Sequence, residues 1–128
     1  MASVLVVDDH RPTVKLIEES LTAAGYAART AHSGPEAVVE VQHGRPDLVI
    51  LELAMPGTEG LIVLRWLREA YPDPRLPVIV LTARTDPAGR DEALVQRADL
   101  YLTKPCPMEA LVAAVRQLLG HRKVEAQS

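Results

Sequence analysis

The sequence predicts an α/β domain in which five parallel strands form a sheet covered by five helices. Short apolar runs alternate along the 128-residue chain with longer amphipathic stretches, a rhythm typical of repeated strand and helix units. Some of these runs are almost continuously aliphatic, as expected for strands buried on both faces of a sheet. The chain contains no Phe and few other aromatic residues, which favours a core of Val, Leu, Ile and Ala.

The five strands are expected at the apolar runs. They cover residues 4–7, 27–30, 48–51, 78–81 and 100–103. The first, third and fourth of these runs are the most continuously aliphatic. We therefore expect these three to be buried on both faces.

Apolar residues at helical spacing predict the five helices between and after the strands. The first covers about residues 12–24 and stops at Gly25. The second follows Ser33, an N-cap residue with Glu36 three positions later, and ends near Gly44. The third carries an apolar stripe and is closed by two prolines, the fourth is weaker and covers residues 86–97, and the fifth covers about residues 108–119. The stripe of the third helix consists of Leu61, Leu64, Trp66 and Leu67, and that of the fifth consists of Leu111, Val112, Val115, Leu118 and Leu119.

Length and composition fit one soluble globular domain, which we place at residues 1–120 with a frayed C-terminal tail at 121–128. The sequence leaves open whether the protein is complete or continues into an output domain. A net charge of -3 provides no diffuse basic field, so direct nucleic-acid binding is not expected.

The sequence carries no signal for export or membrane insertion. There is no apolar run of membrane-spanning length and no basic region followed by an apolar stretch at the N-terminus. Cys106 is the only cysteine, so no intrachain disulfide can form, and we expect it to be a small packing residue. A cytoplasmic location follows from these features.

Polar side chains stand at the carboxyl ends of four predicted strands. Asp8 and Asp9 follow the first strand, and Glu52, Thr82 and Lys104 follow the third, fourth and fifth. In an open parallel sheet these ends converge on one edge, where ligands bind near the switch in strand order. Carboxylates suit a hard cation such as Mg²⁺, while a hydroxyl and an ammonium suit an anionic oxygen. The combination predicts a site for a phosphoryl group.

Each of these residues also has a structural explanation when it is taken alone. The aspartates could cap the following helix, Thr82 and Glu52 could be polar strand ends, and Lys104-Pro105 could mark a turn. Complementary groups at the same edge of a sheet are not explained in this way, which favours a shared site.

Four segments closely resemble the receiver domains of bacterial response regulators, in particular those of the chemotaxis-regulator type. They are VLVVDD at 4–9, PDLVILELAMPG at 46–57, PVIVLTA at 77–83 and YLTKP at 101–105, and the resemblance covers residues 3–119. It implies a flavodoxin-like fold with strand order 2-1-3-4-5. It also implies the family's usual partners, a sensor histidine kinase or a downstream signalling protein.

The resemblance assigns roles to individual positions. Asp8 and Asp9 match the family's metal-binding acidic pair, and the backbone carbonyl of Ala54 matches a further Mg²⁺ ligand. Thr82 matches the hydroxyl residue that moves toward the phosphoryl group, and Tyr101 matches the aromatic switch residue. Lys104 matches the lysine that binds the phosphoryl group, and its bond to Pro105 resembles one that is often cis in this family.

Glu52 stands at the phosphoacceptor position, which carries aspartate in this family. The extra methylene moves the carboxylate outward by roughly 1.5 Å, toward the space of a phosphoryl group. There it could contact Lys104 or Thr82 and imitate phosphorylation. The imitation should be partial, because a carboxylate carries about one negative charge and a phosphoryl group roughly 1.5 to 2. By position Glu52 also joins Asp8, Asp9 and the Ala54 carbonyl as a Mg²⁺ ligand, and we expect Mg²⁺ binding to be weakened or altered.

A second departure concerns the dimer surface of the DNA-binding subfamily. An acidic residue that commonly pairs there with an arginine is replaced by Leu100, and the arginine by Ala114. The loss of this ion pair argues against that dimer and leaves a more apolar patch. We therefore expect a monomer or a weak dimer.

These features lead to one main hypothesis and three alternatives. The main hypothesis is a receiver domain that is not an enzyme and acts as a switch or adaptor without ordinary aspartyl phosphorylation, either as a natural atypical receiver or after an engineered change from Asp to Glu. The first alternative is a receiver that still accepts phosphate from a histidine kinase. The others are a metal-dependent phosphoester hydrolase using Asp8, Asp9 and Lys104, and a purely structural scaffold.

Overall fold

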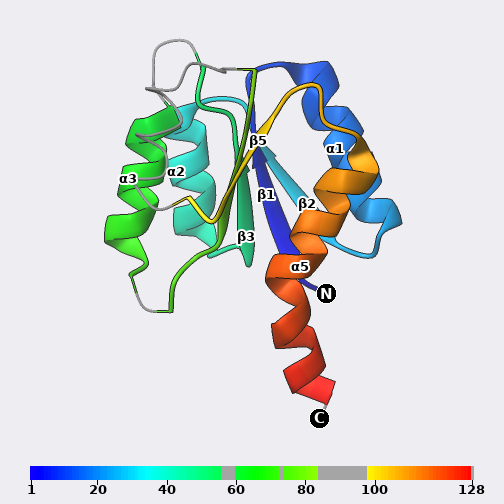
Figure 1. The fold of residues 1–128 in the computed structure, drawn as a ribbon. Coiled ribbons are helices and arrows are strands. Elements are labelled where there is room, and N and C mark those ends of the chain that lie inside the picture. Colours follow the sequence, from blue (N-terminus) through cyan, green and yellow to red (C-terminus); the bar gives the residue numbers. More distant parts are fainter. Residues whose placement is uncertain (56–59, 73, 84–97, 128) are drawn as a thin grey trace.

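Five parallel strands form one sheet in the order β2-β1-β3-β4-β5 (Figure 1). The computed structural model describes residues 1–55, 60–72, 74–83 and 98–127, with side chains up to residue 120. The strands are β1 (Ser3–Val7), β2 (Ala27–Ala31), β3 (Leu48–Leu51), β4 (Val78–Thr82) and β5 (Leu100–Thr103). The predicted fold class and strand order are confirmed.

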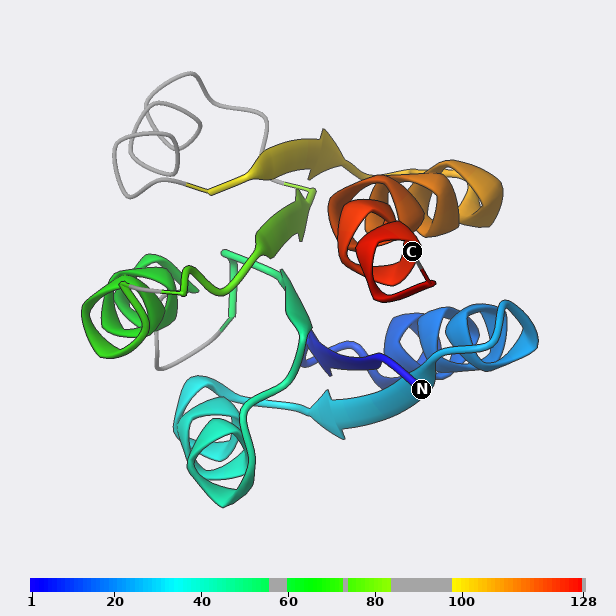
Figure 2. The ribbon, with the colours of Figure 1, turned by 90° about the horizontal axis from the view of Figure 1, so that it is seen from below.

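The described helices are α1 (Arg11–Ala23), α2 (Gly34–His43), α3 (Gly60–Ala70) and α5 (Met108–Gln127). Figure 2 shows that α1 and α5 lie on one face of the sheet and α2 and α3 on the other. The helix expected at residues 86–97 lies outside the described residues. Within the described part of the chain, no helix combines the length and apolar character needed to cross a membrane.

The sheet divides the core into two clusters because neighbouring side chains of a strand point to opposite faces. Leu5 and Val7 of β1 belong to the cluster beneath α2 and α3. Val4 and Val6 belong to the cluster beneath α1 and α5. Strands β3 and β4 alternate in the same way, so the continuous aliphatic runs of the sequence supply both clusters.

Local signals set several helix ends as predicted. Ser33 is the N-cap of α2, and its hydroxyl accepts a hydrogen bond of 3.2 Å from the backbone N–H of Glu36. The Glu36 carboxylate lies 3.4 Å from His32 Nδ1. After α1, Gly25 adopts a φ of 95°, a conformation that favours glycine and ends the helix.

Helix α5 is longer than predicted. The segment 121–128, expected to be a frayed tail, continues the helix as far as Gln127, and α5 extends below the sheet in Figure 1. Gly120 does not adopt a positive φ, so it lowers helix propensity without supplying the left-handed turn that ends a helix. No proline follows it to stop the helix.

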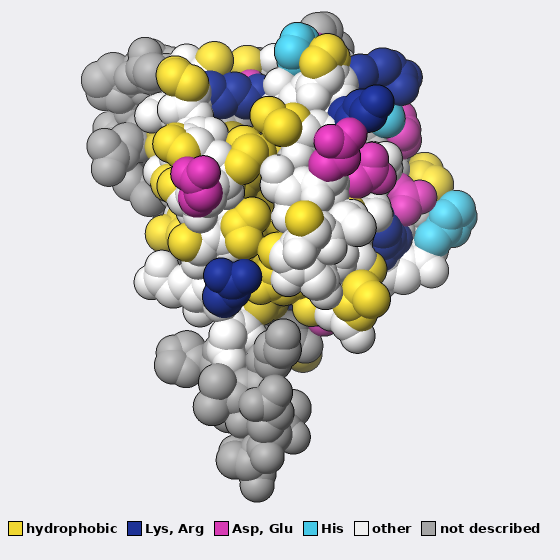
Figure 3. All heavy atoms as spheres, turned by 90° about the vertical axis from the view of Figure 1, so that its right-hand side faces the viewer, with side chains coloured by type: hydrophobic (Ala, Val, Ile, Leu, Met, Phe, Trp, Pro, Cys, Tyr) yellow, Lys and Arg dark blue, Asp and Glu magenta, His cyan; other side chains and the backbone are white. Residues whose placement is uncertain are grey.

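The two residues that stand in place of the dimer ion pair, Leu100 and Ala114, pack toward the core. Ala114 is buried, and Leu100 is partly buried against the same cluster beneath α1 and α5. The short side chain of Ala114 thus contributes to the core. Figure 3 shows the face formed by α1 and α5, where hydrophobic side chains lie among charged ones.

Asp99 joins α3 to the beginnings of β4 and β5. One of its carboxylate oxygens accepts hydrogen bonds from Arg68 Nη2 at 2.8 Å and from the backbone N–H of Val78 at 2.7 Å. The other oxygen lies 3.3 Å from Arg75 Nη2. The side chains of Arg68 and Asp99 are only 11% and 20% exposed, so this ion pair is shielded from solvent.

The substitution Asp99→Ala should lower the free energy of unfolding by about 2–3 kcal/mol, because it leaves Arg68 and the Val78 N–H without this acceptor. The measurement is urea denaturation followed by circular dichroism.

Glu69→Ala is the matched control, since it breaks the Arg65–Glu69 pair, whose side chains are both 69% exposed. That change should cost less than about 0.5 kcal/mol. Equal losses in the two variants would contradict a structural role for Asp99.

Candidate functional site

The ends of β1, β3, β4 and β5 bring the predicted polar residues to one edge of the sheet. Val7 is paired with Leu51 in the register of β1 and β3, so Asp8 and Glu52 follow at the same level. The backbone N–H of Glu52 donates to Val7 O at 2.9 Å, and that of Lys104 donates to Thr82 O at 2.9 Å. Ladder-like backbone bonds thus hold Glu52 and Lys104 directly beyond their strands.

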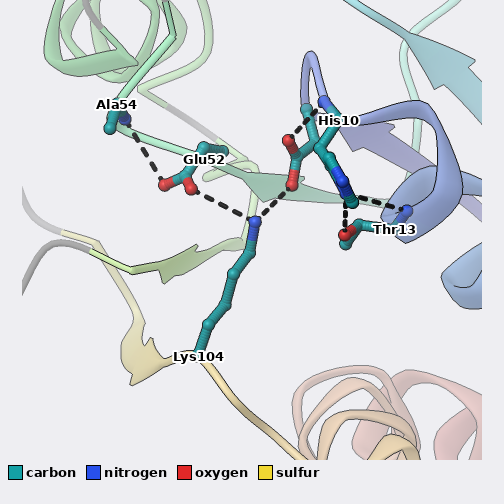
Figure 4. Close-up of polar contacts among 6 residues, drawn as sticks. His10, Thr13, Glu52, Ala54 and Lys104 are labelled. Atoms are coloured by element: carbon teal, nitrogen blue, oxygen red, sulfur yellow. Dashed lines mark hydrogen bonds and ion pairs between the residues drawn. The ribbon is translucent and has the colours of Figure 1, made fainter.

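The ammonium group of Lys104 lies between two carboxylates (Figure 4). Its Nζ atom donates to Asp8 Oδ2 at 2.7 Å and to Glu52 Oε1 at 3.2 Å. These three side chains come from β1, β3 and β5, which are far apart in the sequence. The glutamate therefore reaches the lysine that the resemblance assigns to phosphoryl binding.

All three groups are shielded from solvent. Asp8 and Glu52 are 3% and 6% exposed, and the Lys104 side chain is 22% exposed. Burial alone would lower the pKa of Lys104, but the hydrogen bonds and negative charges of Asp8 and Glu52 outweigh it and raise the pKa. The lysine is therefore held as a cation.

The second carboxylate oxygen of Glu52 turns toward the segment that follows β3. Glu52 Oε2 accepts a weak hydrogen bond of 3.4 Å from the backbone N–H of Ala54. The resemblance assigns the carbonyl of Ala54, rather than its N–H, to Mg²⁺, and that role remains a prediction. Both oxygens of Glu52 thus have partners within the site.

Asp8 also has partners for both of its oxygens. Besides the bond to Lys104, its Oδ1 accepts a hydrogen bond of 2.9 Å from the backbone N–H of His10. His10 is in turn the N-cap of α1, since its Nδ1 atom accepts from the backbone N–H of Thr13 at 3.3 Å. Sequence reasoning considered the aspartates as caps and missed His10, although its place two residues before Pro12 is typical of a helix start.

The remaining predicted site residues differ in exposure. Thr82 is fully buried at the end of β4, whereas Asp9 is exposed. Among the residues that the structure describes, Asp9 takes part in no hydrogen bond or ion pair. Tyr101 is partly buried and packs against the core cluster beneath α2 and α3. The structure therefore joins Asp8, Glu52 and Lys104 directly and places Asp9 at the margin.

The Lys104–Pro105 peptide bond is cis, as the resemblance led us to expect. Cys106, which follows, is partly buried against the cluster beneath α1 and α5, and burial raises the pKa of its thiol. A packing role fits these properties.

The donor atoms suit Mg²⁺ by type, because carboxylate oxygens are its preferred protein ligands. In this structure the Asp8 and Glu52 carboxylates contact Lys104, and Asp9 is exposed. Within the described ranges, no three Asp, Glu, His or Cys side chains form a group able to hold a metal ion.

Known proteins resemble this chain in sequence and structure. It is 42% identical over 122 residues to the response regulator MprA of Mycobacterium ulcerans, an alignment that covers 95% of this chain and 52% of that protein. MprA of Mycobacterium avium gives the same identity and covers 53% of that relative. The chain thus spans about half the length of the curated relatives it matches.

Solved structures that resemble this chain are also receiver proteins. The chemotaxis protein CheY4 of Vibrio cholerae is 31% identical with a TM-score of 0.86, over 93% of this chain and 99% of that one. A CheY-like receiver domain from Methanospirillum hungatei is 21% identical with a TM-score of 0.90, over 98% of each chain, and shows the shared fold.

The model of the response regulator receiver domain matches residues 4–116. The matched range contains the five strands, apart from Ser3 at the start of β1, and every residue of the candidate site. The chain therefore belongs to the response regulator receiver domain family.

Proposed function

We propose that this chain is a switch or adaptor receiver that signals through protein contacts without ordinary aspartyl phosphorylation, with Glu52 setting its resting state. The observation that carries the proposal is the 3.2 Å hydrogen bond from Lys104 Nζ to Glu52 Oε1. This bond joins the acceptor position to the lysine that, by resemblance, would bind a phosphoryl oxygen. The Glu52 carboxylate thereby supplies an anion where phosphorylation would otherwise bring one.

Chemical reasons also disfavour Glu52 as a phosphoacceptor. A carboxylate oxygen attacks phosphorus only when it can approach the donor, yet both oxygens of Glu52 are engaged, by Lys104 and by the Ala54 N–H. The added methylene also moves these oxygens from the place that an aspartate would give them. An incoming phosphodonor would meet the carboxylate in the space intended for the phosphoryl group.

The imitation of phosphorylation is partial. Glu52 contributes about one negative charge, compared with roughly 1.5 to 2 for a phosphoryl group. If the Glu52 carboxylate favoured the active conformer over the inactive one by about 1.4 kcal/mol, the ratio of active to inactive molecules would change only tenfold. The burial of Thr82 and the packing of Tyr101 against the core are compatible with a partial shift.

Receiver domains generally act as signalling modules, interact with histidine kinases and effectors, and bind Mg²⁺ at the phosphorylation site. For this chain we propose a downstream signalling protein as the partner, with a sensor histidine kinase as the alternative. By the family resemblance, Mg²⁺ would be held by Asp8, Asp9, Glu52 and the Ala54 carbonyl. The ion would screen the negative charges of this pocket.

Acetyl phosphate with Mg²⁺ should leave Glu52 unlabelled, while the Glu52→Asp variant should become phosphorylated because its carboxylate is withdrawn from the phosphoryl space. Labelling is measured by mass spectrometry, with sensitivity to acid and hydroxylamine as the signature of an acyl phosphate.

Glu52→Gln serves as the control that removes the nucleophile and keeps the side-chain length, and it should stay unlabelled at this position. Efficient Mg²⁺-dependent labelling of Glu52 itself would sink the proposal and favour a phosphorylation-competent receiver.

The Lys104 ion pairs should make stability depend on pH in the alkaline range. The folded-state pKa of Lys104 is raised above its ordinary value of 10.5, so the stabilisation is fully present below that pH. It is lost as the pH rises through the folded-state pKa. In metal-free buffer, the difference in unfolding free energy between the unchanged chain and Lys104→Met should therefore narrow above pH 10.5.

Urea denaturation at neutral pH and at a series of alkaline values measures this difference. Lys15→Met is the control, since Lys15 is exposed on α1. A difference for Lys104→Met that stays constant across the alkaline range would show that its charge does not stabilise the site.

A further inference from the structure

Gly60, the first residue of α3, lies against the backbone that carries Glu52. A Cβ atom at this position would stand 2.4 Å from Glu52 O and 2.5 Å from Leu53 Cα. Both are backbone atoms, so no side-chain rotation could relieve the overlap. The backbone N–H of Gly60 also donates to Leu53 O at 2.9 Å, which fixes the start of α3 on this segment.

This close approach distinguishes Gly60 from Gly25, Gly44 and Gly120. A Cβ atom added at Gly25, Gly44 or Gly120 would meet no atom within 4 Å, although at Gly25 the φ of 95° would strain any other residue. Glycine is also a poor residue for a helix, since alanine loses less backbone freedom there. The approach of α3 to the Glu52 backbone gives a physical reason for glycine at this buried helix start.

The Glu52 backbone is fixed from both sides. Its N–H donates to Val7 O at 2.9 Å, and its carbonyl lies beneath Gly60. The side chain projects between these two restraints toward Lys104. A shift of the peptide after Glu52 would therefore move the base of the side chain that makes the lysine contact.

The two contacts of Lys104 differ in their sensitivity to such a shift. The bond to Glu52 is 3.2 Å long, near the upper end for an N–H···O bond, whereas the bond to Asp8 is 2.7 Å long. Asp8 follows β1, so its position does not depend on the connection from β3 to α3. Displacement of α3 should break the Glu52 contact and preserve the Asp8 contact.

We propose that Gly60 is a positioning residue for Glu52, because the missing Cβ lets α3 seat the Glu52 peptide where its carboxylate reaches Lys104. Its significance for signalling rests on the proposed function, but the positioning itself does not. Any side chain at position 60 would move α3 away from the peptide and separate Glu52 from Lys104. The glycine thereby determines whether the Glu52 carboxylate contacts Lys104.

The test is a structure determination of the Gly60→Ala variant of the full chain. The distance from Glu52 Oε1 to Lys104 Nζ should rise from 3.2 Å to beyond the 4.0 Å limit of an ion pair, while the Asp8 to Lys104 distance stays near 2.7 Å. A general loosening of the fold would not break the Glu52 contact while preserving the Asp8 contact. Retention of the Glu52 contact, or loss of both contacts, overturns the proposal.

Gly44→Ala is the matched control, because it adds the same methyl group in open space, and it should leave both distances unchanged. If Gly60→Ala does not fold in plain buffer, both distances are determined in trimethylamine N-oxide, which favours the compact state. A variant that stays unfolded there assigns Gly60 to folding as a whole and contradicts the positioning role.

A second readout tests the same residue in the Glu52→Asp background. Adding Gly60→Ala to that variant should lower its rate of labelling by acetyl phosphate at least tenfold, because the carboxylate is displaced, while Gly44→Ala should not. An unchanged rate overturns the positioning role. Labelling of Glu52 itself contradicts the proposed function and leaves the positioning role standing, and if Glu52→Asp is not labelled, the two distances alone decide the role of Gly60.

Discussion

The Lys104 ammonium group between the carboxylates of Asp8 and Glu52 is the interaction on which the rest of the site depends. Two buried carboxylates at one edge of a sheet repel each other unless a cation lies between them. Lys104 meets this requirement with bonds of 2.7 and 3.2 Å. Because the three residues follow β1, β3 and β5, the same interaction ties the middle of the sheet to its edge.

The length of the Glu52 side chain determines which groups its two carboxylate oxygens contact. One oxygen contacts Lys104 and the other accepts from Ala54, so the carboxylate spans the space between β5 and the segment after β3. An aspartate would withdraw the carboxylate by roughly one carbon-carbon bond, about 1.5 Å. The glutamate therefore changes the geometry of the pocket without changing its formal charge. A signal that depends on this pocket would respond to how far the side chain at position 52 extends toward Lys104, rather than to the gain of a charge.

The framework around the pocket leaves little freedom for that geometry to vary. The aliphatic side chains of the strands pack into two core clusters, and this packing fixes the positions of the strand ends relative to one another. Helix α3 adds a second restraint, because Gly60 brings it onto the Glu52 peptide. Asp99 anchors the other end of α3 to the beginning of β4 through Arg68 and the Val78 N–H. The site is thus positioned by packing at both ends of one helix.

The sequence by itself determined the strand order expected from the family resemblance, the alternation of strands and helices, and the polar groups at the strand ends. These features are local, since aliphatic runs, caps such as Ser33 and turn residues such as Gly25 act within a few residues. It did not determine that α5 continues to Gln127, because a glycine can either end a helix, as Gly44 ends α2, or remain within it, as Gly120 does. Only the tertiary structure decided that Lys104 takes Asp8 and Glu52 as partners while Asp9 remains exposed, and that α3 rests on Glu52 through Gly60. The Lys104 contacts join residues distant in sequence, and the Gly60 contact depends on how α3 packs against the segment after β3, so neither follows from a local residue pattern.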